Sequence, residues 1–102
     1  MHIVLLDDAA RDDLVNAMAT YDSLKDGLGF DFAERVKDIL SHIAENPSLY
    51  PVFHRQFRKA VMDRFPYLVI YHLVHDEVRV MAIWHGKRSP RKLLQRLNKP
   101  SA

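Results

Sequence analysis

The run of residues from Tyr67 to Val74 restricts the fold of this chain more than any other feature of its sequence. The run reads YLVIYHLV, and every side chain except His72 is apolar or aromatic, with no alternation of polar and apolar positions. Such an uninterrupted run is typical of a strand that is buried on both faces. We therefore expect a central strand with partner strands on both edges and packed side chains above and below it.

Two neighbouring segments are predicted to be those partners. Residues Arg55–Met62 read as a strand with one basic side, and Val78–Trp84 read as the next strand, after a tight turn at His75-Asp76. Successive side chains of a strand point to opposite faces of the sheet. One face of the last strand is therefore expected to carry Val78, Val80, Ala82 and Trp84.

The first half of the chain has helical periodicity after a short apolar strand at His2–Leu6. Asp7 or Asp8 is suited to cap a first helix, because a carboxylate accepts hydrogen bonds from the free N–H groups of the first turn. Gly27 and Gly29 are expected to end this helix. Its apolar positions recur at helical spacing: Leu14, Ala17, Met18, Tyr21, Leu24 and Leu28.

A second helix is predicted to start with Asp31 and Glu34 as a capping box and to end before Pro47. Two helices joined by a short link that contains glycine form a hairpin, which we expect to pack on one face of the sheet. The apolar stripe of the second helix consists of Phe32, Val36, Ile39, Leu40 and Ile43.

The predicted class is α+β, in the order β-α-α-β-β-β. It comprises an N-terminal strand, a two-helix hairpin and a three-stranded antiparallel meander, followed by a short basic helix or tail at Arg91–Leu97. The 102 residues, 48% of them hydrophobic, fit a single domain over 1–102, and the lack of Cys excludes a disulfide scaffold. With no signal peptide or long apolar run, we expect a cytoplasmic protein without a membrane partner.

The charge of the chain is unevenly distributed. Residues 1–49 carry 10 acidic and 4 basic side chains, whereas residues 50–102 carry 3 acidic and 11 basic ones. A basic surface of this kind favours an anionic partner, such as nucleic acid, the ribosome or an acidic protein segment. The alternative is a solvated basic face that serves solubility alone.

Metal and cofactor chemistry is not indicated. The six histidines lack the spacing of metal ligands, and 3 Gly are too few for a phosphate-binding loop, so we expect no metal and no cofactor. The pairs Asp7-Asp8 and Asp12-Asp13 are interpreted as helix caps and a solvated face, because neighbouring residues diverge on a helix.

The segment His85-Gly86-Lys87-Arg88-Ser89-Pro90 follows directly after the last strand and combines several reactive groups. Lys87 and Arg88 are suited to hold phosphates, and an imidazole such as that of His85 gains or loses a proton near neutral pH. The alternative is an ordinary turn that ends a strand, with surface cations and a hydrogen-bonded histidine.

Several segments together resemble toxins of the RelE/ParE superfamily, from prokaryotic type II toxin–antitoxin modules. The segments are the leading strand, the helical hairpin ending in LSHIAENP, the strand RFPYLVIY, and VMAIWHGKR near the C-terminus. Their order and spacing extend over nearly the whole chain. The resemblance implies a small sheet beside two N-terminal helices, in agreement with the pattern of the residues.

The superfamily contains two activities. The RelE-like branch cuts mRNA on the ribosome without a metal, with basic side chains on the concave sheet face and an acid–base group near the C-terminus. By resemblance, that role would fall here on Lys59, Arg88 and His85. Three other positions of that pattern are aliphatic: Val61, Leu68 and Leu94.

The ParE-like branch poisons DNA gyrase and is not itself a catalyst, and the missing basic and tyrosine positions favour this branch. Either activity implies a cognate antitoxin that wraps the toxin and forms a hetero-oligomer with it. Phe53, Phe57, Leu93 and Leu94 are candidates for exposed apolar contacts, although Phe57 also suits the core. The residues expected to contact the target or the antitoxin are Arg55, Arg58, Arg64, Arg79, Lys87, Arg91, Lys92, Leu93 and Leu94.

Overall fold

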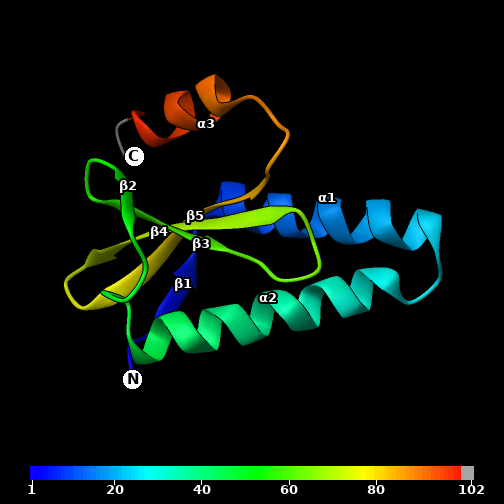
Figure 1. Ribbon diagram of the computed structural model, residues 1–102, viewed down its shortest axis with the longest axis horizontal. Coiled ribbons are helices and arrows are strands. Elements are labelled where there is room, and N and C mark those ends of the chain that lie inside the picture. Colours follow the sequence, from blue (N-terminus) through cyan, green and yellow to red (C-terminus); the bar gives the residue numbers. More distant parts are fainter. Residues whose placement is uncertain (100–102) are drawn as a thin grey trace.

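A computed structural model describes residues 1–99 and shows one mixed sheet with helices on both faces (Figure 1). The elements are β1 (Val4–Leu6), α1 (Asp8–Leu24), α2 (Leu28–Glu45), β2 (Val52–His54), β3 (Phe57–Val61), β4 (Tyr67–Val74), β5 (Glu77–His85) and α3 (Pro90–Leu97). The strand order is β1-β5-β4-β3-β2, in which β1 runs parallel to β5 and the other pairs are antiparallel. The predicted α+β class is confirmed.

The predicted central strand is confirmed as β4, which has the bounds expected from the sequence and lies in the middle of the sheet. Its centre, Val69–Tyr71, is fully buried. The tight turn before β5 is also confirmed, since His75 and Asp76 both have positive φ, 50° and 66°, as a two-residue hairpin turn of type I′ requires.

The strands differ from the sequence expectations in three respects. The first strand is shorter than predicted and starts at Val4, and a fifth strand, β2, was not foreseen. The predicted strand Arg55–Met62 is confined to β3, because Arg55 has a φ of 51° and occupies the turn between β2 and β3. A three-residue edge strand carries too few alternating positions to be recognised in the sequence.

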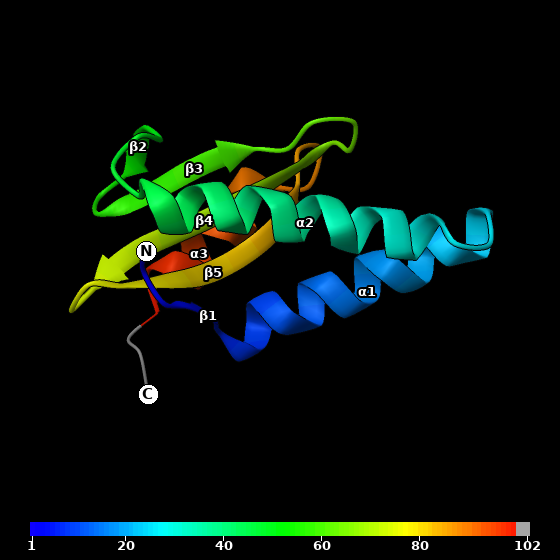
Figure 2. The same cartoon turned by 90° about the horizontal axis from the view of Figure 1, so that it is seen from below.

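The two faces of the sheet have separate cores. The α1–α2 hairpin covers one face and α3 covers the other, as the two perpendicular views show (Figures 1 and 2). We call these the hairpin face and the α3 face. On the hairpin face Tyr71, Val69 and Val80 pack with side chains from α1 and α2. On the α3 face Trp84 and Ile70 pack with Leu93 and Leu97 of α3.

A β-bulge in β5 determines which side chains reach each face. Tyr71 pairs with Val80, but the preceding residue of β4, Ile70, pairs with Ala82, so Met81 is an extra residue on β5. The alternation of side chains therefore changes phase at Met81. Val80 lies in the core beneath the hairpin, whereas Ala82 lies in the core beneath α3.

The bulge overturns one expectation from the sequence. The prediction that Val78, Val80, Ala82 and Trp84 share a face is wrong, because the first two belong to the hairpin face and the last two to the α3 face. An alternating pattern in the sequence contains no sign of the extra residue. As a result Trp84 is presented to α3, and the arrangement of the site depends on this.

The hairpin is held by close contact between its helices. Gly29 lies within α2, and its N–H donates to Oδ1 of Asp22 on α1 at 2.8 Å. The expectation that Gly27 and Gly29 both end α1 and that Asp31 caps α2 is wrong. Gly27, with a φ of 86°, is the N-cap, and Asp31 lies in the first turn. At the start of α1, Asp7 is the N-cap residue but its side chain makes no capping hydrogen bond.

A cluster of aromatic rings fills the space between the hairpin and the β3–β4 loop. The ring of Phe32 lies 5.2 Å from that of Phe65 and 4.9 Å from that of Tyr67, both nearly edge to face, and Tyr21 lies 5.0 Å from Phe65. Such pairs add to the free energy of burial. None of the described helices is both long and apolar enough to cross a membrane.

We predict that Gly29→Ala destabilises the protein. A Cβ at this position would collide with the backbone oxygen of Met18 and lie 2.9 Å from the Asp22 carboxylate. Overpacking of this kind costs about 1–3 kcal/mol, more than the roughly 1 kcal/mol that alanine gains over glycine in a helix. Urea unfolding should show a lower free energy of unfolding.

Gly86→Ala is the control for this prediction, since a Cβ there would meet only the Pro66 oxygen at 3.4 Å. If Gly29→Ala were as stable as Gly86→Ala, close packing of the two helices at this point would not be needed.

Candidate functional site: the α3 face and the end of β5

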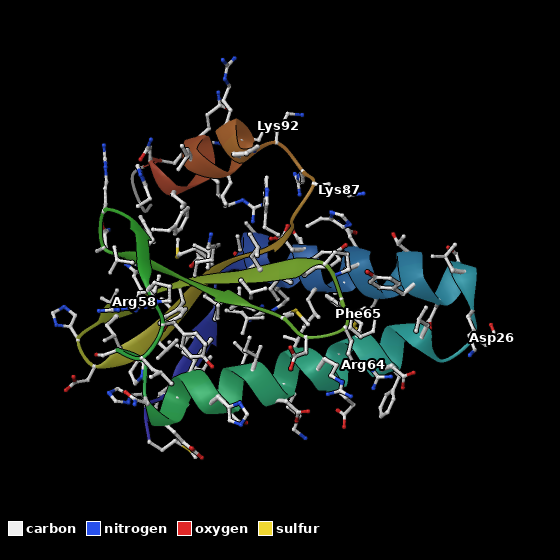
Figure 3. All side chains as sticks on the ribbon, in the orientation of Figure 1. Asp26, Arg58, Arg64, Phe65, Lys87 and Lys92 are labelled. Atoms are coloured by element: carbon white, nitrogen blue, oxygen red, sulfur yellow. The ribbon has the colours of Figure 1, made fainter. Side chains whose placement is uncertain are left out.

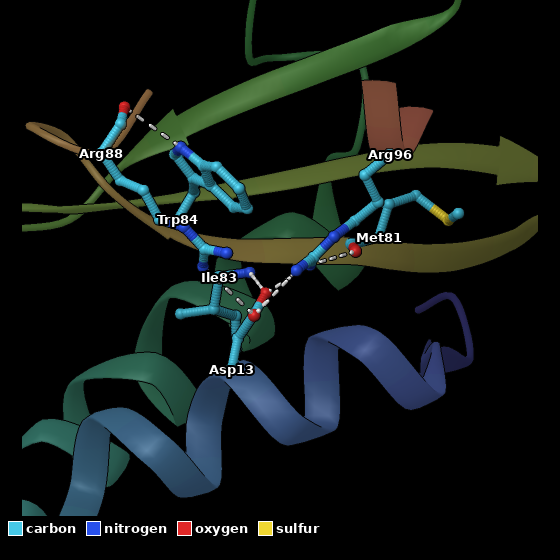
Figure 4. Close-up of polar contacts among 6 residues, drawn as sticks. All are labelled: Asp13, Met81, Ile83, Trp84, Arg88 and Arg96. Atoms are coloured by element: carbon cyan, nitrogen blue, oxygen red, sulfur yellow. Dashed lines mark hydrogen bonds and ion pairs between the residues drawn. The ribbon is translucent and has the colours of Figure 1, made fainter. Parts of the chain in front are cut away.

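A buried carboxylate on α1 organises the end of the sheet where the predicted site residues lie. Asp13 has a side chain only 7% exposed, and its Oδ2 accepts hydrogen bonds from the Ile83 N–H at 2.9 Å and from Nη1 of Arg96 at 2.6 Å. Nη2 of Arg96 donates to Oδ1 at 3.1 Å, so the guanidinium binds the carboxylate with two parallel hydrogen bonds (Figure 4). Asp13 thereby joins α1, β5 and α3.

The Ile83 N–H is available because β1 is short. The pairing of β1 with β5 ends at Leu6 and Val80, so the edge of β5 beyond Val80 has no partner strand. An unpaired backbone N–H that is buried costs free energy comparable to a lost hydrogen bond. The Asp13 carboxylate supplies the missing acceptor.

Two arginines flank the indole of Trp84. The guanidinium carbon of Arg88 lies 3.8 Å from the indole centroid and that of Arg96 lies 5.0 Å from it, within the range of cation–π attraction. Nη1 of Arg88 is also 4.0 Å from Oδ1 of Asp13, and Nε1 of Trp84 donates to the Arg88 carbonyl at 3.4 Å. These contacts hold the turn after β5 and α3 against the sheet.

The interpretation of Asp12-Asp13 as a solvated pair is wrong for Asp13. The carboxylate is buried because Asp13 shares its helix face with Ala10 and Ala17, three positions before and four positions after it. That spacing was the available signal, since two buried alanines leave room for a neighbouring element to approach closely. Arg96 was likewise missed, because its partner is 83 positions away.

The candidates for ribonuclease chemistry are divided between the two faces of the sheet. Lys59 pairs with Ile70 on the α3 face, and its Nζ lies 5.8 Å from the ring centroid of Phe53. His85 pairs with Tyr67 on the hairpin face, with ring centroids 5.0 Å apart. The structure brings His85 and Arg88 together in one small hollow, but it does not bring Lys59 to them.

Four predicted contact arginines lie away from that hollow. Nη1 of Arg58 donates to the Tyr50 carbonyl at 2.5 Å, so this guanidinium stabilises the loop before β2. Arg64 has a φ of 71° in the β3–β4 loop, and Arg55 lies in the β2–β3 turn. Arg79 lies 3.4 Å from Glu77.

The charge of Arg79 helps to lower the pKa of His72 on the α3 face. The pKa of His72 is lowered, first by burial and then by the positive charge of Arg79. His72 is therefore held in its neutral form near pH 7, and this end of the face offers a cation and a neutral ring, with Glu77 beside the cation.

Three basic side chains of α3 and of the turn before it are exposed to solvent, unlike Arg96. Lys87 and Lys92 project from the outer side of the β5–α3 turn and of α3, away from the sheet (Figure 3), and Arg91 is also exposed. The expectation that Leu93 is exposed is wrong, because its side chain is 4% exposed inside the core of the α3 face. Phe57 lies in the same core, the alternative that the sequence allowed for it. Leu94 and Phe53 are half-buried.

No metal centre is formed by the residues that the structure describes. Among residues 1–99, no three His, Asp or Glu side chains are close enough to share an ion. The polar groups at the end of β5 instead combine two guanidiniums, one carboxylate, an imidazole and a phenol.

The sequence matches a family model described as "ParE toxin of type II toxin-antitoxin system, parDE" over residues 4–90. The chain therefore belongs to the ParE toxin family, within the RelE/ParE superfamily, and is a toxin of the toxin–antitoxin type. No curated protein matches the sequence.

Solved structures of other toxins share the fold, among them the following three. A chain of the chromosomal ParDE system from P. aeruginosa has a TM-score of 0.63 and 16% identity, covering 83% of this chain and 96% of its own. The isolated E. coli RelE toxin has a TM-score of 0.63 and 16% identity, covering 95% and 99%. A mutant of E. coli RelE in complex with a peptide of its antitoxin RelB has a TM-score of 0.60 and 16% identity, covering 99% and 98%.

We predict that Asp13→Asn loosens α3. An amide cannot replace the charge that binds Arg96, and hydrogen bonds to charged groups contribute about 1.5–3 kcal/mol each. We expect the free energy of unfolding to fall by about 2 kcal/mol, and hydrogen exchange at the amides of Leu93 and Leu97 to become faster.

The matched control is Asp12→Asn, the same change at the exposed neighbouring position. A surface change of this kind should alter stability by less than about 0.5 kcal/mol. Equal exchange rates in α3 for the two variants would show that Asp13 does not hold this helix.

Proposed function

We propose that this toxin inhibits growth by poisoning DNA gyrase and that a cognate antitoxin neutralises it by forming a toxin–antitoxin hetero-oligomer. The observation that carries the proposal is the apolar character of the α3 face. Where the ribonuclease branch holds RNA phosphates on basic side chains, this face packs Phe57, Ile70, Ala82 and Trp84 against Leu93 and Leu97.

The positions that are aliphatic in the sequence lie together on this face. Val61 pairs with Leu68, and Leu68 pairs with Trp84, so the three side chains form one row across the sheet. Leu94 lies on α3. An aliphatic row neither stabilises a phosphate nor moves a proton, which supports the gyrase proposal over the ribonuclease alternative.

The division of the basic set between two faces supports the same choice. Transfer of a phosphoryl group within RNA needs an acid–base group and cations within hydrogen-bond distance of one phosphate. Lys59 and His85 lie on opposite faces of a sheet, so one phosphate does not reach both.

The exposed cations around α3 are the proposed contact surface. Lys87, Arg91 and Lys92 carry three positive charges on the outer side of α3 and the turn before it. Their charges are directed away from the sheet, where they meet an approaching macromolecule rather than a buried group. We assign this surface to gyrase or to the antitoxin, both of which are then expected to present acidic side chains.

The structure of RelE with an antitoxin peptide supports the expectation of an antitoxin for this chain. Leu94 follows the exposed Arg91 by three positions on α3, and the ring of Phe53 lies 5.8 Å from Nζ of Lys59. These half-buried side chains suit an amphipathic segment of such a partner. Leu93 and Phe57 are available to it only if α3 moves.

We predict that brief induction of this chain in bacteria that lack an antitoxin stops DNA synthesis first. Incorporation of labelled thymidine should fall within minutes, before incorporation of labelled methionine. In a purified assay, gyrase should fail to supercoil a relaxed plasmid when the chain is added. Methionine incorporation falling first, with cut mRNA on ribosomes, would instead establish the ribonuclease alternative.

We predict that reversing two charges on α3 relieves growth inhibition. Deleting residues 87–102 is a poor test, because α3 completes a core and residues 100–102 lie outside the described part of the chain. Arg91→Glu with Lys92→Glu keeps Leu93 and Leu97 in place. We expect this double variant to fold and to inhibit gyrase at least tenfold more weakly, as the loss of electrostatic complementarity predicts.

The matched control is Lys25→Glu with Lys37→Glu, an equal charge change at exposed positions of the acidic half. If the control lost activity to the same degree, net charge rather than the α3 surface would determine inhibition.

A further inference from the structure

A small hollow lies on the hairpin face at the end of β5. Its volume is about 140 Å³, and it is lined by polar groups from α1, from the β4–β5 pair and from the turn after β5. These groups belong to Asp13, Asn16, Thr20, Tyr67, His85 and Arg88. The residues come from distant parts of the sequence, so their meeting is a property of the fold.

Each element brings its residues to the hollow for a geometric reason. Asp13, Asn16 and Thr20 follow one another at three and then four positions along α1, so they lie on one side of the helix. Tyr67 and His85 are direct partners on β4 and β5. The chain then turns back, and Arg88 is held there because its N–H donates to the His85 carbonyl at 3.0 Å.

Two side chains that line the hollow, those of His85 and Tyr67, each carry a hydrogen that they can donate. The Lys87 N–H donates to Nδ1 of His85 at 3.0 Å, so Nδ1 is an acceptor and the ring carries its proton on Nε2. The pKa of Tyr67 is raised, first by burial and then by the charges of Tyr21 and Asp13, so its hydroxyl remains a donor at neutral pH. Both groups line the hollow.

The charges around the hollow leave a surplus of one cation. Asp13 is bound by Arg96 through two hydrogen bonds, which compensate its carboxylate. Arg88 lies farther from it, at 4.0 Å, and its side chain is half exposed. Arg88 can therefore bind an anion in the hollow while Asp13 keeps its partner.

We propose that this hollow binds a phosphate group, held by the guanidinium of Arg88, the Tyr67 hydroxyl and Nε2 of His85. A tetrahedral oxyanion matches the planar fork of an arginine and accepts hydrogen bonds from several donors at once. The phosphate belongs either to a free nucleotide or to a nucleic-acid backbone. The site goes beyond gyrase poisoning, since it is on the opposite face from α3 and its phosphate binding can be measured on the isolated chain.

The test is a titration of the isotope-labelled full chain, followed by NMR at constant ionic strength. The three probes are inorganic phosphate, adenosine monophosphate, and a ten-nucleotide single strand without a terminal phosphate. We expect saturable shifts of the signals of Tyr67, His85 and Arg88 with at least one probe.

Two variants test the assignment, each with a matched control. Tyr67→Phe removes one hydroxyl and keeps the aromatic packing, and Tyr50→Phe makes the same change outside the hollow. Arg88→Gln removes the charge, and Arg11→Gln removes an exposed arginine charge on α1 outside the hollow. We expect each site variant to weaken binding about tenfold or more, as the loss of a hydrogen bond to a charged group implies, and each control to leave it unchanged.

The probes separate the two sources of phosphate. Binding of inorganic phosphate and adenosine monophosphate assigns the site to a terminal phosphate, and binding of the single strand alone assigns it to a phosphodiester. Absence of saturable shifts with all three probes would overturn the proposal. Equal weakening of phosphate binding by the site variants and the control variants would also overturn the proposal. Neither result tests whether the protein inhibits gyrase.

Discussion

The hydrogen-bonded carboxylate of Asp13 is the interaction on which the rest of the structure depends. It accepts from a backbone N–H of β5 that has no strand partner, and it binds the arginine that fixes α3. A buried ion pair contributes little net stability compared with a well-packed apolar replacement, but the loss of one member leaves an unpaired charge and an orphan N–H. Asp13 therefore fixes α3 over Trp84 together with the apolar contacts of Leu93 and Leu97.

The bulge at Met81 distributes the remaining side chains. Because β5 changes phase there, its first half supplies apolar side chains to the hairpin face and its second half supplies Trp84 to the α3 face and His85 to the hairpin face. The same shift removes His85 from the side on which Lys59 lies. The apolar surroundings of Trp84 on the α3 face and the presence of His85 in a polar hollow on the hairpin face are therefore two results of a single inserted residue.

Much of the fold was predictable, since the two hairpin helices have apolar residues at helical spacing and β4 is a long apolar run. The bulge was not predictable, because the alternation of side chains along a strand gives no sign of where one extra residue is inserted. The burial of Asp13 depends on its contact with Arg96 of α3, at the opposite end of the chain, and the burial of Leu93 depends on packing against strands that are distant from it in sequence. In the candidate site, the nearness of Arg88 to His85 was predictable because the two residues are three positions apart. The separation of Lys59 from His85 was not predictable, because it depends on the bulge at Met81.

The pairing of β1 with β5 has a consequence for how the protein is made. Val4 lies beside Val78, and Asp13 binds a residue 83 positions later, so β1 has no partner until β5 has been synthesised and Asp13 has none until α3 follows. Closing such long loops is entropically costly and slows folding. A nascent chain that has been synthesised only as far as β4 contains the α1–α2 hairpin. It lacks the pairing of β1 with β5 and the packing of α3 on the sheet. The native fold of this toxin therefore forms only after β5 and α3 have been synthesised, and a copy truncated before these elements lacks the contacts that complete the fold.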